Sequence, residues 1–212
     1  MLLLDRYPQE RYTDRDLELP VFYEFLERTK GEIGSVIDVG AHHSAGYYAP
    51  TLRKYATFYD ALDPTYDWET DAIADRFIEA DATKYAFDEY DLVLCLSTIE
   101  HVGQYPVKYP EYKEARLDLF KSMLKAAGKY LWISFPVGQE IVIPNEMALV
   151  GQQELDQWLE LVRPYQTTAG YFFSNGPQAG YPWRKATREE CIYHSYEDKL
   201  GNQTICILEV KK

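Results

Sequence analysis

Three acidic residues stand at the ends of short apolar runs, in positions that suit nucleotide binding. Asp38 lies in the run 36–39, which leads into Gly40, and a glycine there allows a sharp turn and a close approach to a ligand. Asp63 follows the run 57–62, about 20 residues beyond this turn, the interval at which a carboxylate accepts hydrogen bonds from a ribose. Asp81 ends the run 76–80 in the same way. The alternatives are an ordinary strand-to-helix turn after Asp38 and an Asp-Pro turn at Asp63.

Alternating strand-like and helix-like segments would position these acids. The apolar runs typical of buried strands are 36–39, 57–62, 76–80, 90–97 and 129–135. Helical patterns lie between them, the clearest over 111–127, and another opens at Pro20 after a charged segment, 5–19, that we expect on the surface. The order predicts an α/β fold with a doubly wound, mostly parallel, seven-stranded sheet. A C-terminal antiparallel hairpin, made by 191–196 and 203–210, would close it.

Composition narrows the range of partners. The formal net charge of the 212 residues is −12, and an acidic surface repels nucleic acids and anionic membranes. Cys95, Cys191 and Cys206 lie in apolar runs without paired spacing, which indicates buried free thiols in a reducing compartment. The apolar residues that open the chain are too few for a signal peptide or a membrane span. We therefore expect a cytoplasmic protein with a small-molecule substrate and with no nucleic-acid or membrane partner.

The segment around the fourth expected strand carries the most specific motif. It reads Asp91-Leu92-Val93-Leu94-Cys95-Leu96-Ser97-Thr98-Ile99-Glu100-His101-Val102. Together with the five strand-helix units and the acids after the first three strands, it resembles the class I S-adenosylmethionine-dependent methyltransferases. The resemblance covers residues 36–136 by motif and the closing hairpin by pattern. It implies a Rossmann-like fold, S-adenosylmethionine as the cofactor and methyl transfer as the reaction.

The resemblance also assigns roles to single residues. Asp38 and Gly40 would lie beside the methionine part of the cofactor, and Asp63 would hold the ribose hydroxyls. Asp81 and Ala82 would meet the adenine. Ser97 would line the floor of the site near the sulfonium.

The loop after the first strand departs from the family pattern of alternate glycines. His42 and Ser44 occupy the places of the second and third glycines, and Gly46 follows two positions later. His42 therefore belongs to the expected cofactor-binding set. The imidazoles of His42 and His43 could crowd the cofactor or point outward, with His43 reaching the substrate side.

Glu100 and His101 are the expected catalytic residues. Imidazole has a suitable pKa for removing a proton from a hydroxyl nucleophile, and Glu100 could orient the ring or bind a substrate hydroxyl. The alternative is that both residues cap the following segment. Some relatives chelate a divalent ion through Glu-x-x-Glu-His, but Ser97 replaces the first glutamate here, and two ligands rarely make a site. We expect no metal.

The whole chain, 1–212, is expected to form a single methyltransferase-like domain. It would comprise an N-terminal segment and helix (1–35), a cofactor-binding core (36–136), a lid-like insertion (137–190) and the closing hairpin (191–212). Aromatic residues interleaved with glycine, proline and asparagine over 171–184 suit a loop that covers a ligand. The alternative for this loop is a surface segment packed down by its own aromatic side chains.

Three functions are compatible with these observations. The first is a methyltransferase that acts on a small polar acceptor, a hydroxyl group of a sugar or another metabolite; a basic protein substrate would also suit the acidic charge. The second is a catalytically silent protein of the same fold that serves as a binding or partner subunit, with His42 and His43 marking a degenerate loop. The third, a dehydrogenase-like enzyme, is weaker because the first turn lacks the dinucleotide glycine pattern.

Overall fold

The computed structural model describes residues 14–103, 111–143, 147–174, 183–195 and 203–212. Helices and strands alternate along the first part of the chain. They are α1 (Arg15–Arg28), β1 (Ser35–Val39), η2 (Ser44–Gly46), α2 (Ala49–Leu52), β2 (Phe58–Asp63), α3 (Trp68–Asp71), β3 (Arg76–Glu79), β4 (Tyr90–Leu96), η3 (Ile99–His101) and α4 (Glu111–Ala126). The second part contains β5 (Ala127–Pro136), β6 (Val142–Ile143), β7 (Met147–Ala148), α5 (Gln152–Val162), β8 (Gln166–Ser174), β9 (Arg184–Lys185), α6 (Arg188–Ile192) and β10 (Gln203–Lys211).

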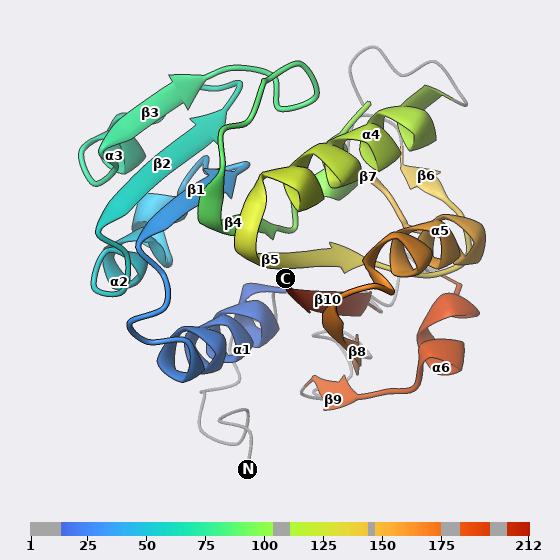
Figure 1. Ribbon diagram of the computed structural model, residues 1–212. Helices are drawn as coiled ribbons and strands as arrows, with labels where there is room; N and C mark the ends of the chain where they lie inside the picture. The colour runs from blue at the N-terminus through green and yellow to red at the C-terminus, as the bar shows by residue number, and fades with distance from the viewer. Residues whose placement is uncertain (1–13, 104–110, 144–146, 175–182, 196–202) are drawn as a thin grey trace.

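A single large sheet organises the molecule (Figure 1). Within the described residues it has eight strands in the order β3-β2-β1-β4-β5-β10-β8-β9. The pairs from β3 to β5 are parallel, whereas β10 runs antiparallel to both β5 and β8. The strand order reverses direction at β1, and such a switch point opens a crevice at the carboxyl ends of the strands. The expected fold class is confirmed, with the short β9 as an added edge strand.

Helices cover both faces of the sheet. On one face α4, α5 and α6 pack against side chains such as Ile37, Val93 and Ile133. Figure 1 shows α4 and α5 lying side by side over the region of β4 and β5. On the other face α1 and α2 pack on Leu92, Leu94 and the β5 aromatics. Successive strand residues thus alternate between two buried layers, as a sheet covered on both sides requires.

Helix α1 begins earlier than the sequence predicts. Asp14 caps it by accepting a hydrogen bond from the backbone of Arg15, and Pro20 lies inside the helix instead of opening it. A proline in this position removes one backbone hydrogen bond. The buried contact of Phe22 with Trp132, at 5.0 Å between ring centroids, is part of the packing that holds the helix in place. Residues 15–19 are therefore helical and are not a surface wrap, and residues 5–13 of the expected surface segment lie outside the described residues.

Two expectations about the second half of the chain are wrong. The partner of β10 is β8 and not the segment 191–196, since α6 ends at Ile192 and begins with a capping box in which Thr187 and Glu190 bond reciprocally. The segment 137–190 supplies α5 to the core and β8 and β9 to the sheet, so these parts are not a lid. Residues 171–174 of the expected aromatic loop belong to β8, and 175–182 lie outside the described residues. The division of the chain into one domain stays a prediction.

Candidate active site at the carboxyl ends of the parallel strands

The loop after β1 is held tightly against its neighbours. The backbone N–H groups of Gly40 and Ala41 both donate to the carbonyl oxygen of Leu62 in β2, at 2.8 and 3.3 Å. Gly40 has φ +82°, and a Cβ at this position would lie 2.1 Å from Oγ1 of Thr98, in the loop after β4. Only glycine fits here, because the conformation and the space both exclude a side chain. The loops after β1 and β4 are thus in direct contact.

Asp63 lies at the end of β2 and faces the loop after β1. Its side chain accepts hydrogen bonds from the backbone N–H of His42, at 3.2 Å, and of Thr65, at 2.8 Å. Asp63 is 8% exposed. Each carboxylate oxygen can accept two hydrogen bonds, so each keeps acceptor capacity beyond the one backbone donor. The geometry leaves Asp63 able to accept further bonds from a pair of hydroxyl groups.

The imidazoles of His42 and His43 are exposed. Their ring centroids lie 3.8 Å apart, and His43 adopts a left-handed conformation with φ 65°. Ser44, by contrast, is buried and lies within hydrogen-bonding distance of the hydroxyl of Tyr59, at 3.1 Å. Of the two arrangements considered for the imidazoles, the structure has the outward one.

Asp67, the N-cap residue of α3, lies next to these imidazoles. Ligand atoms of His42, His43 and Asp67 lie within 4.8 Å of one another, a spacing that a metal ion could bridge. However, Asp67 already accepts bonds from the backbone N–H groups of His43 and Glu69 and from the hydroxyl of Thr70. Three of its four acceptor positions are therefore filled, and its contacts are those of a helix cap.

Asp38 lies behind the loop, away from the surface that a ligand would contact. It is fully buried, and its two oxygens accept hydrogen bonds from the hydroxyls of Tyr48, at 3.0 Å, and Tyr59, at 3.1 Å. Burial raises the pKa of Asp38 to about 7, and the two phenol hydroxyls oppose that rise. The expected contact with a methionine group is therefore not available to this side chain, which supports the loop from the inside.

Asp81 and Ala82 follow β3, next to the end of β2. The backbone N–H of Ala80 donates to the carbonyl of Asp63, which joins the two strand ends. The side chain of Asp81 is 46% exposed, accepts bonds from Thr83 and pairs with Lys84 at 3.0 Å. Partial burial acts to raise the pKa of Asp81, but these bonds hold it below its ordinary value. Asp81 is thus at the expected edge, although its oxygens already have partners in the protein.

The end of β4 is closed by helix α1. Ser97 has φ +39°, and its hydroxyl donates to Oε1 of Glu18 at 2.5 Å. Glu18 is fully buried and pairs with Arg15 at 2.6 Å. Burial raises the pKa of Glu18, and Arg15 opposes the rise. The sequence interpretation assigned no role to Glu18 or Arg15. The start of their helix is nevertheless recognisable, because Asp14 is followed by acidic residues in the first turn.

Glu100 and His101 lie in η3, immediately after Ser97 and Thr98. Glu100 is 3% exposed, and burial, followed by the nearby Glu18 and Asp14, raises its pKa to about 8. The His101 side chain is 53% exposed, and its Nε2 lies 4.0 Å from Oε1 of Glu100. The two side chains thus lie close together, one buried and one open to solvent.

The comparisons with known proteins agree on the fold. No family model matches the sequence, and no curated protein matches it significantly. A SAM-dependent methyltransferase of Leishmania major has a similar structure, with a TM-score of 0.59 at 14% identity over 92% of this chain and 72% of that chain. One from Archaeoglobus fulgidus gives a TM-score of 0.56 at 16% identity over 94% and 95% of the two chains. The N-methyltransferase NodS of Bradyrhizobium japonicum, solved with S-adenosyl-L-homocysteine, gives 0.51 at 8% identity over 94% and 88%.

This chain has the methyltransferase fold. Within that fold the residues gathered at one edge come from loops distant in the sequence: the segments after β1, β2 and β4 and the start of α1. The resemblance stated from the sequence is thereby confirmed at the level of the fold.

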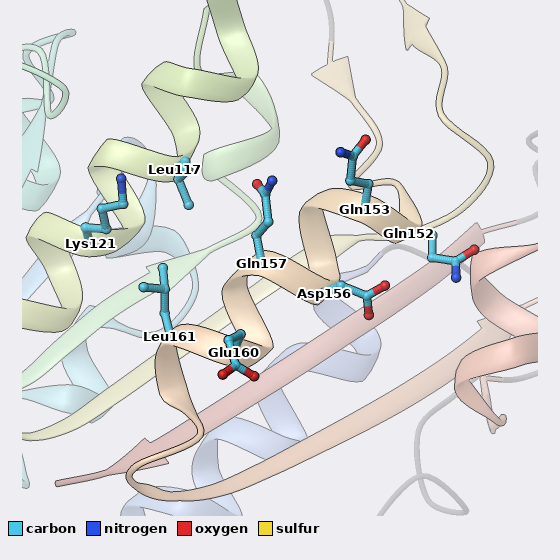
Figure 2. Close-up of a pocket in the computed structure, with 8 residues that line it drawn as sticks. All are labelled: Leu117, Lys121, Gln152, Gln153, Asp156, Gln157, Glu160 and Leu161. Atoms are coloured by element: carbon cyan, nitrogen blue, oxygen red, sulfur yellow. The ribbon is translucent and has the colours of Figure 1, made fainter.

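A large cleft lies elsewhere on the methyltransferase fold, between α4 and α5. Figure 2 shows its lining, with Leu117 and Lys121 on α4 and Gln157 and Leu161 among the residues on α5. Its volume is about 700 Å³, and none of the acids described above lines it. Size alone does not identify a site. The cluster of carboxylates at the strand ends is the better candidate, because it lies beside the switch point of the sheet.

Among the described residues, no helix is long and apolar enough to cross a membrane.

Proposed function

We propose that this protein is an S-adenosylmethionine-dependent methyltransferase that acts on a small polar acceptor, a hydroxyl group of a sugar or another metabolite. The observation that carries the proposal is the pairing of Asp63 with the loop after β1. The carboxylate lies beside the loop after β1, the strand at which the order reverses, and it keeps lone pairs that a ribose could use.

The residues at this edge suit a cationic cofactor. Asp63, Glu18 and Glu100 supply carboxyl groups, while Arg15 is paired with Glu18. When bound, S-adenosylmethionine would supply an electrophilic methyl group on a positively charged sulfur. Asp63 would hold the ribose, Asp81 and Ala82 would border the adenine, and the backbone of Gly40 and Ser97 would form the floor.

On the acceptor side, we assign proton transfer to His101. Its exposed imidazole would accept the proton of the acceptor hydroxyl, and Glu100, 4.0 Å away, would orient the ring or bind a second polar group. Holding the acceptor oxygen in line with the methyl group would supply much of the rate. The cytoplasmic location stays a prediction, which the three buried free cysteines support.

One alternative is a catalytically silent protein of the same fold, serving as a binding or partner subunit. The observation that favours it is the loop 42–44, where side chains replace glycines and the two imidazoles lie against each other, tilted by 43°. Cofactor binding separates the two functions.

Calorimetric titration with S-adenosylmethionine and S-adenosylhomocysteine tests the proposal. We expect saturable binding of both ligands to the wild type. Asp63→Ala should lose about 1–3 kcal/mol of binding free energy, because a ribose hydroxyl would be left without its partner. Asp63→Asn should show how much of this loss depends on the charge, and Asp118→Ala, on exposed α4 surface, is the matched control. No binding to the wild type would support the silent alternative, and an unchanged affinity in Asp63→Ala would remove this residue from the site.

A further inference from the structure

A small cavity opens beside the ends of β4 and β5, separate from the loop after β1. Its volume is about 70 Å³. Asp14 and Glu100 line it, together with apolar residues that include Pro136, Leu149 and Ile205. A cavity needs roughly 10–15 Å³ of probe volume to hold one water molecule, so this one has room for a small polar group. It is therefore suited to one terminal group of a ligand.

Glu100 offers an unused acceptor to this cavity. Within the part of the chain that the structure describes, Oε2 of Glu100 has no hydrogen-bond partner, although the residue is 97% buried (3% exposed). A buried polar atom normally has a hydrogen-bond partner, supplied by the protein, an ordered water or a ligand. Because Glu100 is one of the residues that line the cavity, a ligand bound there can supply this partner.

The charges around Glu100 favour a positive partner. Burial is the main cause of the raised pKa of Glu100, and the neighbouring acids Glu18 and Asp14 raise it further. The nearest guanidinium, Arg15, is already paired with Glu18 at 2.6 Å. His101 is exposed at 4.0 Å, and the buried thiol of Cys95 brings no positive charge. Among the described residues that act on Glu100, three carboxyl groups, its own included, therefore share one guanidinium, and an added cation would lower the electrostatic energy of the cluster.

We propose that this cavity binds the ammonium group of the methyl acceptor, so that the acceptor is an amine-bearing metabolite. The nitrogen would donate hydrogen bonds to Oε2 of Glu100 and to the carboxylate of Asp14. The adjoining methylene would pack on Leu149 and Ile205. This inference rests on the proposed methyltransferase function and narrows its acceptors to cationic molecules such as amino sugars and amino alcohols.

The direct test uses ethylammonium chloride as the probe and ethanol as its neutral counterpart. In protein labelled with ¹³C at the glutamate carboxyl groups, NMR follows the titration of Glu100 with 100 mM of either probe and with matched sodium chloride. We expect ethylammonium to lower the pKa of Glu100 by at least one unit and ethanol to leave it unchanged. Glu154 is the internal control, because its pKa is also raised, to about 6, but it is paired with Arg116 and does not line the cavity.

The pH dependence gives a second readout. Ethylammonium stays protonated up to about pH 10, as a lysine side chain does, whereas Glu100 ionises near pH 8. A cation prefers the ionised carboxylate, so its affinity should rise as the pH rises through this value. We expect binding at least tenfold tighter at pH 9 than at pH 6 in the wild type, and no such change in Glu100→Gln.

The outcomes separate the two proposals when S-adenosylmethionine is titrated into the same samples. Equal effects of ethylammonium and ethanol on Glu100, or no effect of either, overturn the cation site even where the cofactor binds. Binding of ethylammonium with the expected pH dependence, but without cofactor binding, supports the cation site and removes the methyltransferase function. Asp14→Asn should weaken ethylammonium binding without abolishing the titration of Glu100, and an unchanged affinity would exclude Asp14 from the site.

Discussion

The hydroxyl of Ser97, at the end of β4, donates a hydrogen bond to the buried carboxyl group of Glu18 in α1, 79 positions earlier in the chain. Glu18 also accepts from Arg15, which reaches the carbonyl of Leu96 at 3.5 Å. The start of α1 is thus bonded to the carboxyl end of β4. This strand end leads into the short helix η3, which carries Glu100 and His101. A change in this helix should therefore affect the candidate site.

Replacing Glu18 with alanine should destabilise the protein by about 2–3 kcal/mol, because Ser97 loses its acceptor and Arg15 loses its partner. Urea denaturation measures this. Lys30→Ala, on the exposed end beyond the same helix, is the control and should stay within about 0.5 kcal/mol of the wild type. Similar stabilities of the two variants would contradict a structural role for the Glu18 contact.

Gly40→Ala should lower the free energy of unfolding by more than about 1 kcal/mol. The left-handed backbone strains any side chain at this position, and the new Cβ would collide with Thr98. Gly46→Ala is the matched change in the same loop, where a Cβ meets nothing within 4 Å. Thermal denaturation of both variants compares them. An equally small loss of stability in the two variants would contradict the contact between the loops after β1 and β4.

Asp38→Asn tests the buried acid behind the loop. Its folded pKa, about 7, is above the ordinary value of 3.8, so the folded protein binds the extra proton between these values. The favourable contribution of Asp38 to the free energy of unfolding is therefore present at low pH and is lost as the pH rises through 7. We expect Asp38→Asn to be more stable relative to the wild type at pH 8 than at pH 5, as measured in urea. A difference that does not change with pH would indicate that Asp38 is ionised throughout.

The buried pair of Arg116 and Glu154 should be the most sensitive ion pair to break. The two side chains meet at 2.6 Å and are 0% and 4% exposed. Glu154→Ala leaves a buried guanidinium without compensation, which costs about 3–5 kcal/mol. Glu160→Ala removes the partner of exposed Arg163 and should cost no more than about 1 kcal/mol. Chemical denaturation at pH 8 compares the two, and equal costs would contradict the burial of the first pair.

The parallel half of the sheet was predictable because its signals are local. Each apolar run is continuous, and an acid or small polar residue marks its end, as with Asp63 and Ser97. The placement of Asp63 beside the loop after β1 follows from the topology once the strands are known. The helix over 111–127 was predictable for the same reason, since its apolar stripe is regular.

The antiparallel half was not predictable in this way. The residues 191–193 look like a strand by composition, but the capping box of Thr187 and Glu190 starts a helix before them. The composition of 171–174 predicts a loop, whereas these residues end strand β8, because their pairing with β10 depends on residues 29–35 positions away. The role of Glu18 was hidden for a similar reason, since its contact with Ser97 joins distant segments.

Strand β10, the latest of the described strands in the chain, lies between β5 and β8. Strands β8 and β9 thus have no direct pairing with the parallel half and join it only through β10. During synthesis, β8 would leave the ribosome well before the strand that it needs as a neighbour. Its backbone donors and its apolar side chains would stay exposed until then, so this interval is the one in which chaperone binding or aggregation would compete with folding.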